Sequence, residues 1–259
     1  MQLRFKIFGE GYPLIILHGL FGTLDNWYTI AKKLSNTYQV YAVDQRNHGR
    51  SPHHDSHTYD DLANDLYIFM HERNIDTAHI VGHSMGGTAA MQFAAHRPDM
   101  VDSLVVVDMA PRDYDPRHNN LFQVFDAVDP AQFQRRQDID EAVKEYLPDR
   151  AVRQYILKNI IRDEEGNYRW KFNLKAIREN YRSIISGPII DEAVEKPALF
   201  IKGGRSPYIS GEDAGKIQQL FPNSKIETIP EAGHWVHSDA PDRFLEIVRK
   251  FLDAPTERE

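Results

Sequence analysis

The stretch His79-Ile80-Val81-Gly82-His83-Ser84-Met85-Gly86-Gly87 decides the fold class of this chain. A short apolar run, His79 to Val81, leads into a glycine-flanked serine, and helical sequence then extends from Met85 to His96 and stops before a proline. The pattern Gly-x-Ser-x-Gly between a strand and a helix is typical of a sharp, strained turn that exposes the serine. We therefore predict that Ser84 offers a nucleophilic hydroxyl beside the positive end of a helix. A glycine-rich turn with an incidental serine is the alternative.

Short apolar runs recur along the chain and alternate with longer segments of helical character. Near-continuous apolar strands of this kind are typical of a mostly parallel sheet that helices cover on both faces. We therefore predict an α/β fold, with ligands bound beyond the carboxyl ends of the strands. The expected strands are Leu14–Leu17, Val40–Val43, His79–Val81, Leu104–Val107, Ala198–Ile201 and Ile226–Ile229, with one more within Met1–Phe8.

The interval from Pro111 to Lys196 interrupts this alternation, because it contains no convincing strand. Its charged segments, such as Asp138–Tyr146 and Ala151–Arg162, have helical character. A structureless loop of this length is implausible in a compact domain. We expect a helical cap inserted between core strands, with residues 1–111 and 197–259 forming the core and residues 112–196 the cap. A second, unrelated domain is the alternative.

A second turn follows the first long apolar run, in the sequence His18-Gly19-Leu20-Phe21-Gly22. Acyl transfer needs backbone N–H donors directed at the oxyanion that develops in the tetrahedral intermediate. One oxyanion-hole donor is expected from Met85, the residue after the nucleophile, and the other from this turn. Leu20 is the predicted second donor and Phe21 the alternative, because a shift of one residue is not decided by the sequence. An ordinary turn is the competing interpretation.

His234 is the predicted general base among the twelve histidines of the chain. It follows the run Ile226–Ile229 in the sequence Glu231-Ala232-Gly233-His234-Trp235-Val236-His237. A serine followed by a histidine near the C-terminus fits the chain order known for this kind of serine turn. His237, expected one turn further on in a helix, is the alternative.

Five stretches spread from end to end of the chain carry a family resemblance: His18–Asn26, Asp44–Pro52, Gly82–Gly87, Asp108–Pro111 and Gly233–His237. They resemble the α/β-hydrolase superfamily, and within it the serine esterases of the bacterial YbfF type, which are related to the mitochondrial ABHD-eleven hydrolases. The Arg-Asn-His-Gly part of the second stretch is more specific than the others. The resemblance implies an α/β-hydrolase fold and hydrolysis of short acyl esters or acyl-CoA thioesters, without a cofactor.

The sequence departs from this superfamily at the position of the catalytic acid. Most members carry Gly-x-x-Asp after the strand that corresponds to Ala198–Ile201, whereas this chain has Ser206 in place of the aspartate. Serine cannot carry the charge that stabilises an imidazolium. Asp108 is the predicted replacement because it ends the preceding strand at the same edge of the sheet, with Ser206 as a supporting hydrogen-bond donor. Asp213 is the alternative acid.

The residues that bind the acyl group are less defined by the sequence. Phe21 and Trp235 are the predicted substrate-binding residues, and a purely structural packing role is the alternative for Trp235. Asp44 and Arg46 are expected to brace the edge of the site. Four arginines of the interval after Pro111 are candidates for contact with a CoA phosphate, although charged helix faces are usually solvated: Arg112, Arg117, Arg135 and Arg136.

Composition excludes several other classes of function. The chain has 259 residues, a net charge of −7 and no cysteine, which argues against nucleic-acid binding and excludes disulfides and thiolate catalysis. The chain shows neither a signal peptide nor a membrane span, so a cytoplasmic protein without a membrane partner is expected. His53, His54 and His57 cluster near Asp55, but without metal-ligand spacing, and we expect a solvated loop and no metal.

The predicted partner is therefore a small-molecule acyl ester or thioester, and no oligomeric state is predicted. Carbon–carbon hydrolases and aminopeptidases share the same catalytic machinery and are the closest alternatives. A small-molecule receptor that retains this machinery is an alternative from a different class.

Overall fold

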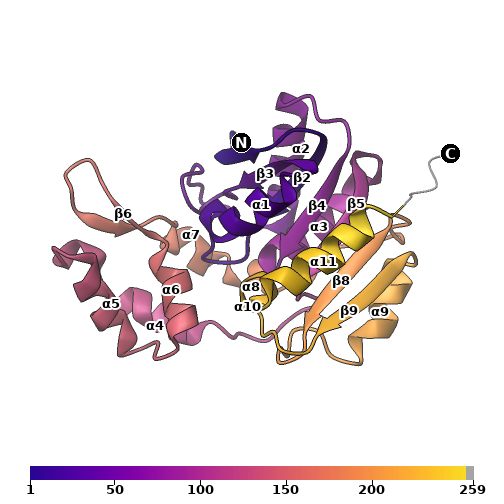
Figure 1. Cartoon of the computed structure of the whole chain (residues 1–259). Helices are drawn as coiled ribbons and strands as arrows, with labels where there is room; N and C mark the ends of the chain where they lie inside the picture. Colours follow the sequence, from indigo (N-terminus) through magenta and orange to yellow (C-terminus); the bar gives the residue numbers. More distant parts are fainter. Residues whose placement is uncertain (255–259) are drawn as a thin grey trace.

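A seven-stranded sheet forms the centre of the computed structural model, which describes residues 1–254 (Figure 1). The strand order is β1-β3-β2-β4-β5-β8-β9, and only β1 runs antiparallel to its neighbour. The predicted fold class is confirmed. The strands are β1 (Phe5–Phe8), β2 (Tyr12–Leu17), β3 (Tyr38–Val43), β4 (Ala78–His83), β5 (Val101–Val107), β8 (Ala198–Gly203) and β9 (Ser224–Ile229).

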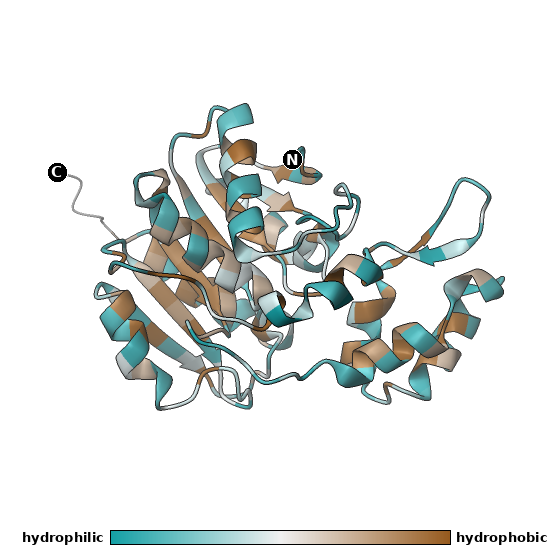
Figure 2. Ribbon diagram, turned by 180° about the vertical axis from the view of Figure 1, so that it is seen from behind, coloured by the Kyte–Doolittle hydropathy of each residue, from teal (hydrophilic) through white to brown (hydrophobic). Residues whose placement is uncertain are grey.

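Helices cover both faces of this sheet, and the alternation of side chains along the strands explains why. In β2, Ile15 and Leu17 pack in the cluster that includes α2 and α3, whereas Leu14 and Ile16 pack in the cluster that includes α1 and α11. Both faces of the strand are therefore apolar, as the brown strands of Figure 2 show. The covering helices are α1 (Tyr28–Leu34), α2 (Tyr59–Glu72), α3 (Met85–His96), α9 (Asp213–Leu220), α10 (Val236–Asp239) and α11 (Pro241–Leu252).

The carboxyl ends of the central strands are aligned. His83 of β4 pairs with Val107 of β5, and Val107 pairs with Ile201 of β8. The ladder continues past the strands, because Ser84 N–H donates to Val107 O (3.0 Å) and Asp108 N–H donates to Ile201 O (2.8 Å). The residues that follow β4 and β5 are therefore held at one edge of the sheet by backbone hydrogen bonds.

The segment between β5 and β8 forms a layer of helices and one hairpin at one end of the sheet (Figure 1). Its elements are α4 (Asn119–Ala127), α5 (Arg136–Lys144), α6 (Arg150–Leu157), β6 (Ile160–Arg162), β7 (Tyr168–Trp170), α7 (Leu174–Glu179) and α8 (Tyr181–Ile184). This segment also contains a short 3₁₀ helix, Pro130–Gln132, and two more lie in the core, Leu24–Trp27 and Pro98–Met100.

The expectation that this segment lacks strands was wrong. The helix expected over Ala151–Arg162 ends at Leu157, and β6 pairs antiparallel with β7. The turn between them explains the hairpin: Asp163 Oδ1 accepts the N–H groups of Glu165 and Asn167, and Gly166 adopts a positive φ of 87°. This aspartate-to-glycine turn signal is present in the sequence, within a run of charged residues.

None of the helices within residues 1–254 is long and apolar enough to cross a membrane.

Gly86→Ala should destabilise the fold, because a Cβ there would lie 2.6 Å from His18 O and collide with the end of β2. We expect the free energy of unfolding to fall by roughly 1–3 kcal/mol, as for other overpacked sites. Urea denaturation followed by circular dichroism measures this. Gly215→Ala in α9 is the matched control, since its Cβ would meet nothing within 4 Å. Equal unfolding midpoints for the two variants would contradict the steric argument.

Candidate active site

Ser84 occupies the tight turn between β4 and α3. Its backbone angles are φ 53° and ψ −121°, a strained combination for a non-glycine residue. Gly82 and Gly86 pack so closely that a Cβ on Gly82 would overlap Gly86 O. The turn therefore has the strand–turn–helix form expected from the sequence, and Ser84 stands at the N-terminal end of α3.

Asp108 lies beside Ser84 at the end of β5 and is completely buried. Its Oδ1 accepts the Gly203 N–H (3.0 Å), and its Oδ2 accepts hydrogen bonds from the Ser206 hydroxyl and from His234 Nδ1 (2.7 Å for the latter). All three partners come from residues that follow or end later strands. The structure thus brings Asp108, Ser206 and His234 into direct contact.

His234 lies in the loop between β9 and α10, and several contacts orient its ring. A carboxylate only accepts hydrogen bonds, so His234 Nδ1 donates to Asp108, and Nε2 is the ring nitrogen left to act as an acceptor when the imidazole has a single hydrogen. The ring of Tyr208 stacks on it with centroids 3.8 Å apart and an interplanar angle of 15°. His83 Nε2 donates to His234 O (2.9 Å), and burial holds the pKa of His83 well below its usual value.

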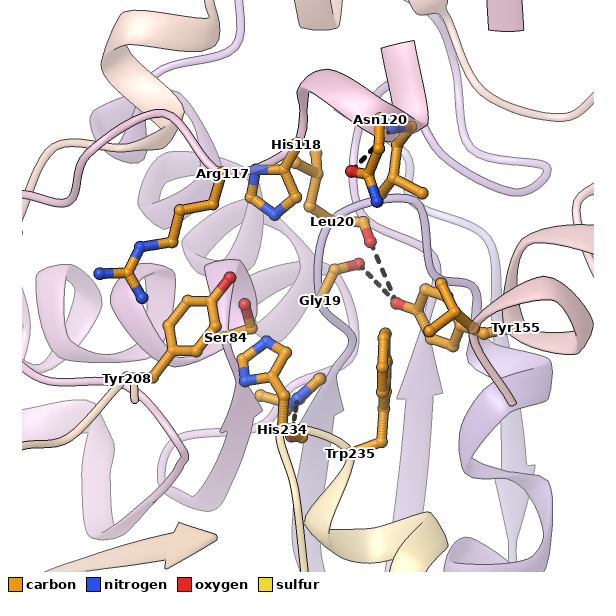
Figure 3. A pocket seen from close by; sticks show the side chains of 13 residues that line it. Gly19, Leu20, Ser84, Arg117, His118, Asn120, Tyr155, Tyr208, His234 and Trp235 are labelled. Atoms are coloured by element: carbon orange, nitrogen blue, oxygen red, sulfur yellow. Dashed lines mark hydrogen bonds between the residues drawn. The ribbon is translucent and has the colours of Figure 1, made fainter. Parts of the chain in front are cut away.

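A cavity of about 210 Å³ opens in front of Ser84 and His234, which both line it (Figure 3). One wall comes from the core, and the other comes from the segment between β5 and β8. A smaller apolar cavity of about 20 Å³ adjoins Ser84 on another side. The larger cavity is lined by Gly19, Leu20, His83, Ser84, Arg117, His118, Asn120, Leu121, Val152, Tyr155, Tyr208, His234 and Trp235.

The two candidate donors of the turn at residues 18–22, Leu20 and Phe21, differ in whether their N–H groups are paired. Phe21 N–H donates to His48 Nε2 (3.1 Å), so it is already paired. Leu20 N–H has no acceptor among residues 1–254, and neither has the N–H of Met85 in the first turn of α3. This difference between Leu20 and Phe21 depends on His48, which lies 27 positions after Phe21 in the chain. The sequence therefore could not decide which of the two residues is the oxyanion-hole donor.

The carbonyl side of the same turn is held by the inserted segment. Gly19 O accepts from Gly22 N–H (2.9 Å), and the Tyr155 hydroxyl lies 3.1 Å from Leu20 O and 3.4 Å from Gly19 O. Asn159 Nδ2 donates to Phe21 O (2.5 Å). Tyr155 and Asn159 are four residues apart, so one face of α6 and the residues after it contact this turn.

The two predicted substrate-binding residues occupy different surroundings. Trp235 lines the larger cavity, with its ring 5.3 Å from that of Tyr155. Phe21 lines neither cavity and has a positive φ of 55°. Its side chain is fully buried against the rings of Phe122, Phe125 and Phe172. The structure therefore places Phe21 in the packing between the core and the inserted segment.

The alternative acid and the alternative base lie in other environments. Asp213 accepts hydrogen bonds from Ser210 and forms an ion pair with Arg112 (2.7 Å), and it makes no contact with His234. His237 is buried against Trp27, with ring centroids 3.9 Å apart, and burial lowers its pKa to about 3. His237 does not line either cavity at Ser84.

Asp44 and Arg46, which the sequence suggested as structural supports at the edge of the site, make buried contacts with neighbouring loops and with α2. Asp44 accepts the N–H groups of Leu24 (2.7 Å) and Arg50 (2.9 Å), so it ties two loops together. Arg46 forms ion pairs with Asp65 (2.6 Å) and Asp61 (3.0 Å).

The histidine-rich loop is only partly solvated. His53 and His54 are exposed, whereas the solvated environment expected for His57 was wrong, because His57 is buried and contacts Asn47 and the sulfur of Met85. Among residues 1–254, no group of three or more histidine, aspartate or glutamate side chains is placed to hold a metal ion.

Of the four candidate arginines, only Arg117 lines the cavity. Arg112 pairs with Asp213, Arg135 pairs with Asp138, and Arg136 donates to Leu157 O. Sequence reasoning also missed Tyr208, His118 and Tyr155, which all line the cavity. Tyr208 had a weak signal, since it follows Ser206 in the loop after β8. The other two lie in the inserted segment, where no motif marks them.

Comparison with known proteins agrees with this architecture. The family model described as the alpha/beta hydrolase fold matches residues 12–241. The chain is 38% identical to the esterase YbfF of Escherichia coli over 242 residues, which cover 93% of this chain and 93% of that protein. It is 36% identical over 264 residues to the sn-1-specific diacylglycerol lipase ABHD11 of Danio rerio, covering 97% of this chain and 83% of the relative.

A solved structure described as a marine microorganism esterase superimposes with a TM-score of 0.94 at 44% identity, covering 96% of this chain and 99% of that one. The chain belongs to the α/β-hydrolase family, and the resemblance indicated by its motifs is confirmed.

Proposed function

We propose that the protein is a serine-dependent carboxylic ester hydrolase whose catalytic residues are Ser84, His234 and Asp108. The observation that carries this proposal is the 2.7 Å contact between His234 Nδ1 and the buried Asp108, with the opposite edge of the imidazole in the cavity that Ser84 lines. The names of the similar proteins, an esterase and a lipase, support ester hydrolysis.

The proposed reaction passes through an acyl-enzyme. His234 Nε2 takes the proton of Ser84 Oγ as this oxygen bonds to the acyl carbon. When the tetrahedral intermediate collapses, the bond to the leaving oxygen or sulfur breaks, and His234 gives its proton to the leaving group. A water molecule then loses a proton to His234 and attacks the acyl carbon, which releases the acid and restores Ser84. The Asp108 carboxylate stabilises the imidazolium in both halves of the reaction.

The N–H groups of Leu20 and Met85 are the proposed oxyanion hole. Leu20 N–H belongs to the same peptide unit as Gly19 O, which accepts hydrogen bonds from Gly22 N–H and His18 Nδ1. Donors on the carbonyl oxygen orient this peptide and polarise its N–H, which strengthens the hydrogen bond to an oxyanion. Tyr155 contributes from the inserted segment, so we treat residues 112–196 as a cap that also supports the oxyanion hole.

We propose short to medium acyl chains as the substrates, with the acyl group directed toward the small cavity. The small cavity beside Ser84 is lined by apolar side chains, including Met85, Met109 and Ile184. We assign the leaving group to the larger cavity, whose lining is mainly apolar but includes Arg117, His118 and Asn120. Thioesters, including those of CoA, belong to the proposed substrate range because the acyl transfer is chemically the same. A panel of acyl-chain lengths, each as p-nitrophenyl ester and CoA thioester, measures this range.

Ser84→Ala should abolish hydrolysis of p-nitrophenyl acetate and p-nitrophenyl butyrate, because it removes the attacking oxygen. The far-ultraviolet circular dichroism spectrum should stay unchanged, since alanine fits the space. Wild-type turnover retained by this variant would refute the nucleophile assignment.

Asp108→Asn should lower kcat by about 10⁴-fold, the loss known for such an acid in other serine hydrolases. Asp213→Asn is the control, and steady-state kinetics on p-nitrophenyl butyrate should show a small effect for it. Ser206→Ala should lower kcat much less than Asp108→Asn does, because it removes a supporting hydrogen-bond donor and leaves the carboxylate of Asp108 in place. If Asp213→Asn lowered kcat strongly and Asp108→Asn hardly changed it, Asp213 would be the catalytic acid.

Tyr155→Phe should lower kcat about threefold to tenfold, the size of one neutral hydrogen bond, with little change in KM. The phenylalanine keeps the ring in the cavity wall but releases the turn that carries the proposed oxyanion donor. A trifluoromethyl ketone, which forms a tetrahedral adduct, should bind more weakly in the same proportion. Tyr146→Phe, at an exposed tyrosine of the same segment, is the control. An unchanged kcat with a raised KM would assign Tyr155 to substrate binding alone.

A further inference from the structure

His118 reaches the cavity from the inserted segment, directly before α4. Its ring is directed into the space in front of Ser84 and His234 (Figure 3). His118 lines both the larger cavity and the small apolar one, so it lies where they join beside Ser84. The proposed mechanism gives this second imidazole no role.

The hydroxyl group of Tyr181 determines which nitrogen of His118 carries a hydrogen. Tyr181 Oη accepts the backbone N–H groups of Arg117 (3.1 Å) and His118 (3.2 Å). These two donors occupy both acceptor positions of the hydroxyl oxygen. Its single hydrogen is then donated to the remaining partner, His118 Nδ1, which lies 2.8 Å away. The Nδ1 atom is therefore an acceptor.

The imidazole of His118 is neutral near pH 7. Burial is the main cause that lowers its pKa to about 4, and repulsion from the protonated form of His234 and from Arg117 adds to this effect. A neutral imidazole that accepts at Nδ1 must carry its hydrogen on Nε2. His118 Nε2 has no hydrogen-bond partner among residues 1–254, so this N–H is available to a bound molecule.

The same argument excludes His118 as a second general base. Its one lone pair is used by the hydroxyl of Tyr181, and the nitrogen that faces the cavity is protonated. His118 can therefore donate a hydrogen bond in the cavity but cannot take a proton from Ser84 or from water. A fixed donor in a site with apolar walls favours a ligand with a matching acceptor, because an unpaired buried N–H costs free energy.

We propose that His118 is a specificity-determining residue whose Nε2–H donates to a second oxygen of the substrate, and that the preferred substrates are oxygen-bearing esters or thioesters. The second oxygen is an ether, hydroxyl or carbonyl oxygen within a few bonds of the reacting carbonyl. This proposal rests on the ester hydrolase function proposed above, and it adds the substrate class of the same site.

Matched substrates that differ only by a CH₂ group or an oxygen atom test the proposal. In the acyl arm, the p-nitrophenyl esters of ethoxyacetate and 3-methoxypropanoate are each compared with pentanoate. In the alcohol arm, 2-methoxyethyl acetate is compared with butyl acetate by pH-stat titration. The ratio of kcat/KM for ether over hydrocarbon is measured for the wild-type protein and for His118→Phe. The intrinsic reactivities of the two substrates cancel when the ratios of the two proteins are compared.

In His118→Phe, the ether-to-hydrocarbon ratio of kcat/KM should fall about threefold to tenfold in at least one arm. The fall should occur for the substrate whose ether oxygen is placed to accept from His118 Nε2. His118→Gln, which keeps an N–H donor at a similar distance, should restore part of it. Tyr181→Phe should lower the ratio as well, because the ring of His118 is then free to carry its hydrogen on Nδ1. Tyr146→Phe is the matched control and should leave every ratio unchanged.

The role of His118 would be overturned if the ether-to-hydrocarbon ratio of kcat/KM were the same in the wild-type protein, His118→Phe and Tyr181→Phe at every oxygen position of both arms. Ester hydrolysis by Ser84 would be unaffected by this outcome. A wild-type protein that hydrolyses none of these esters would overturn this inference together with the proposed function. A uniform loss of activity on ether and hydrocarbon substrates alike would mean that His118 only supports the cavity wall, and it would also overturn the proposal.

Discussion

The candidate site depends on backbone hydrogen bonds that extend the sheet one residue past the ends of β4 and β5. Ser84 donates to Val107 O, and Asp108 donates to Ile201 O, so each residue is anchored to the next strand. Both residues then turn into the left-handed region, with φ of 53° and 52°. Such angles cost roughly 1–3 kcal/mol per non-glycine residue, and they persist only where the surrounding structure imposes them. The aligned ends of three parallel strands impose them here.

The buried carboxylate of Asp108 is the second element of this arrangement. An isolated buried charge is strongly unfavourable, so it requires hydrogen-bond donors on both oxygens. The Gly203 N–H, the Ser206 hydroxyl and His234 Nδ1 supply them. Gly203 and Ser206 both come from β8 and its following loop, the place where relatives of this fold usually carry the acid. In this chain, the loop therefore supplies hydrogen-bond donors to the carboxylate of Asp108, the proposed acid, on the neighbouring strand.

The inserted segment completes the cavity and contacts the core where the chemistry is proposed. Tyr155 and Asn159 donate to carbonyl groups of the turn at residues 18–22, while His118 of the same segment lines the cavity beside Ser84. Movement of this segment would therefore change both the shape of the cavity and the orientation of the peptide at Leu20. In the mechanism proposed above, substrate selection and stabilisation of the oxyanion therefore both depend on this segment.

The sequence by itself determined the α/β architecture, the serine turn, the histidine near the C-terminus and the departure of the acid from its usual place. These features are local: a Gly-x-Ser-x-Gly turn needs its glycines because the strand and helix touch there, and apolar runs specify buried strands. Only the tertiary structure decided that Leu20 and not Phe21 has a free N–H, because the acceptor of Phe21 is His48. It also decided that Phe21 packs away from the cavity and that Tyr155, Tyr208 and His118 line the cavity. Such properties arise from contacts between residues far apart in the chain, and no local pattern of residues encodes them.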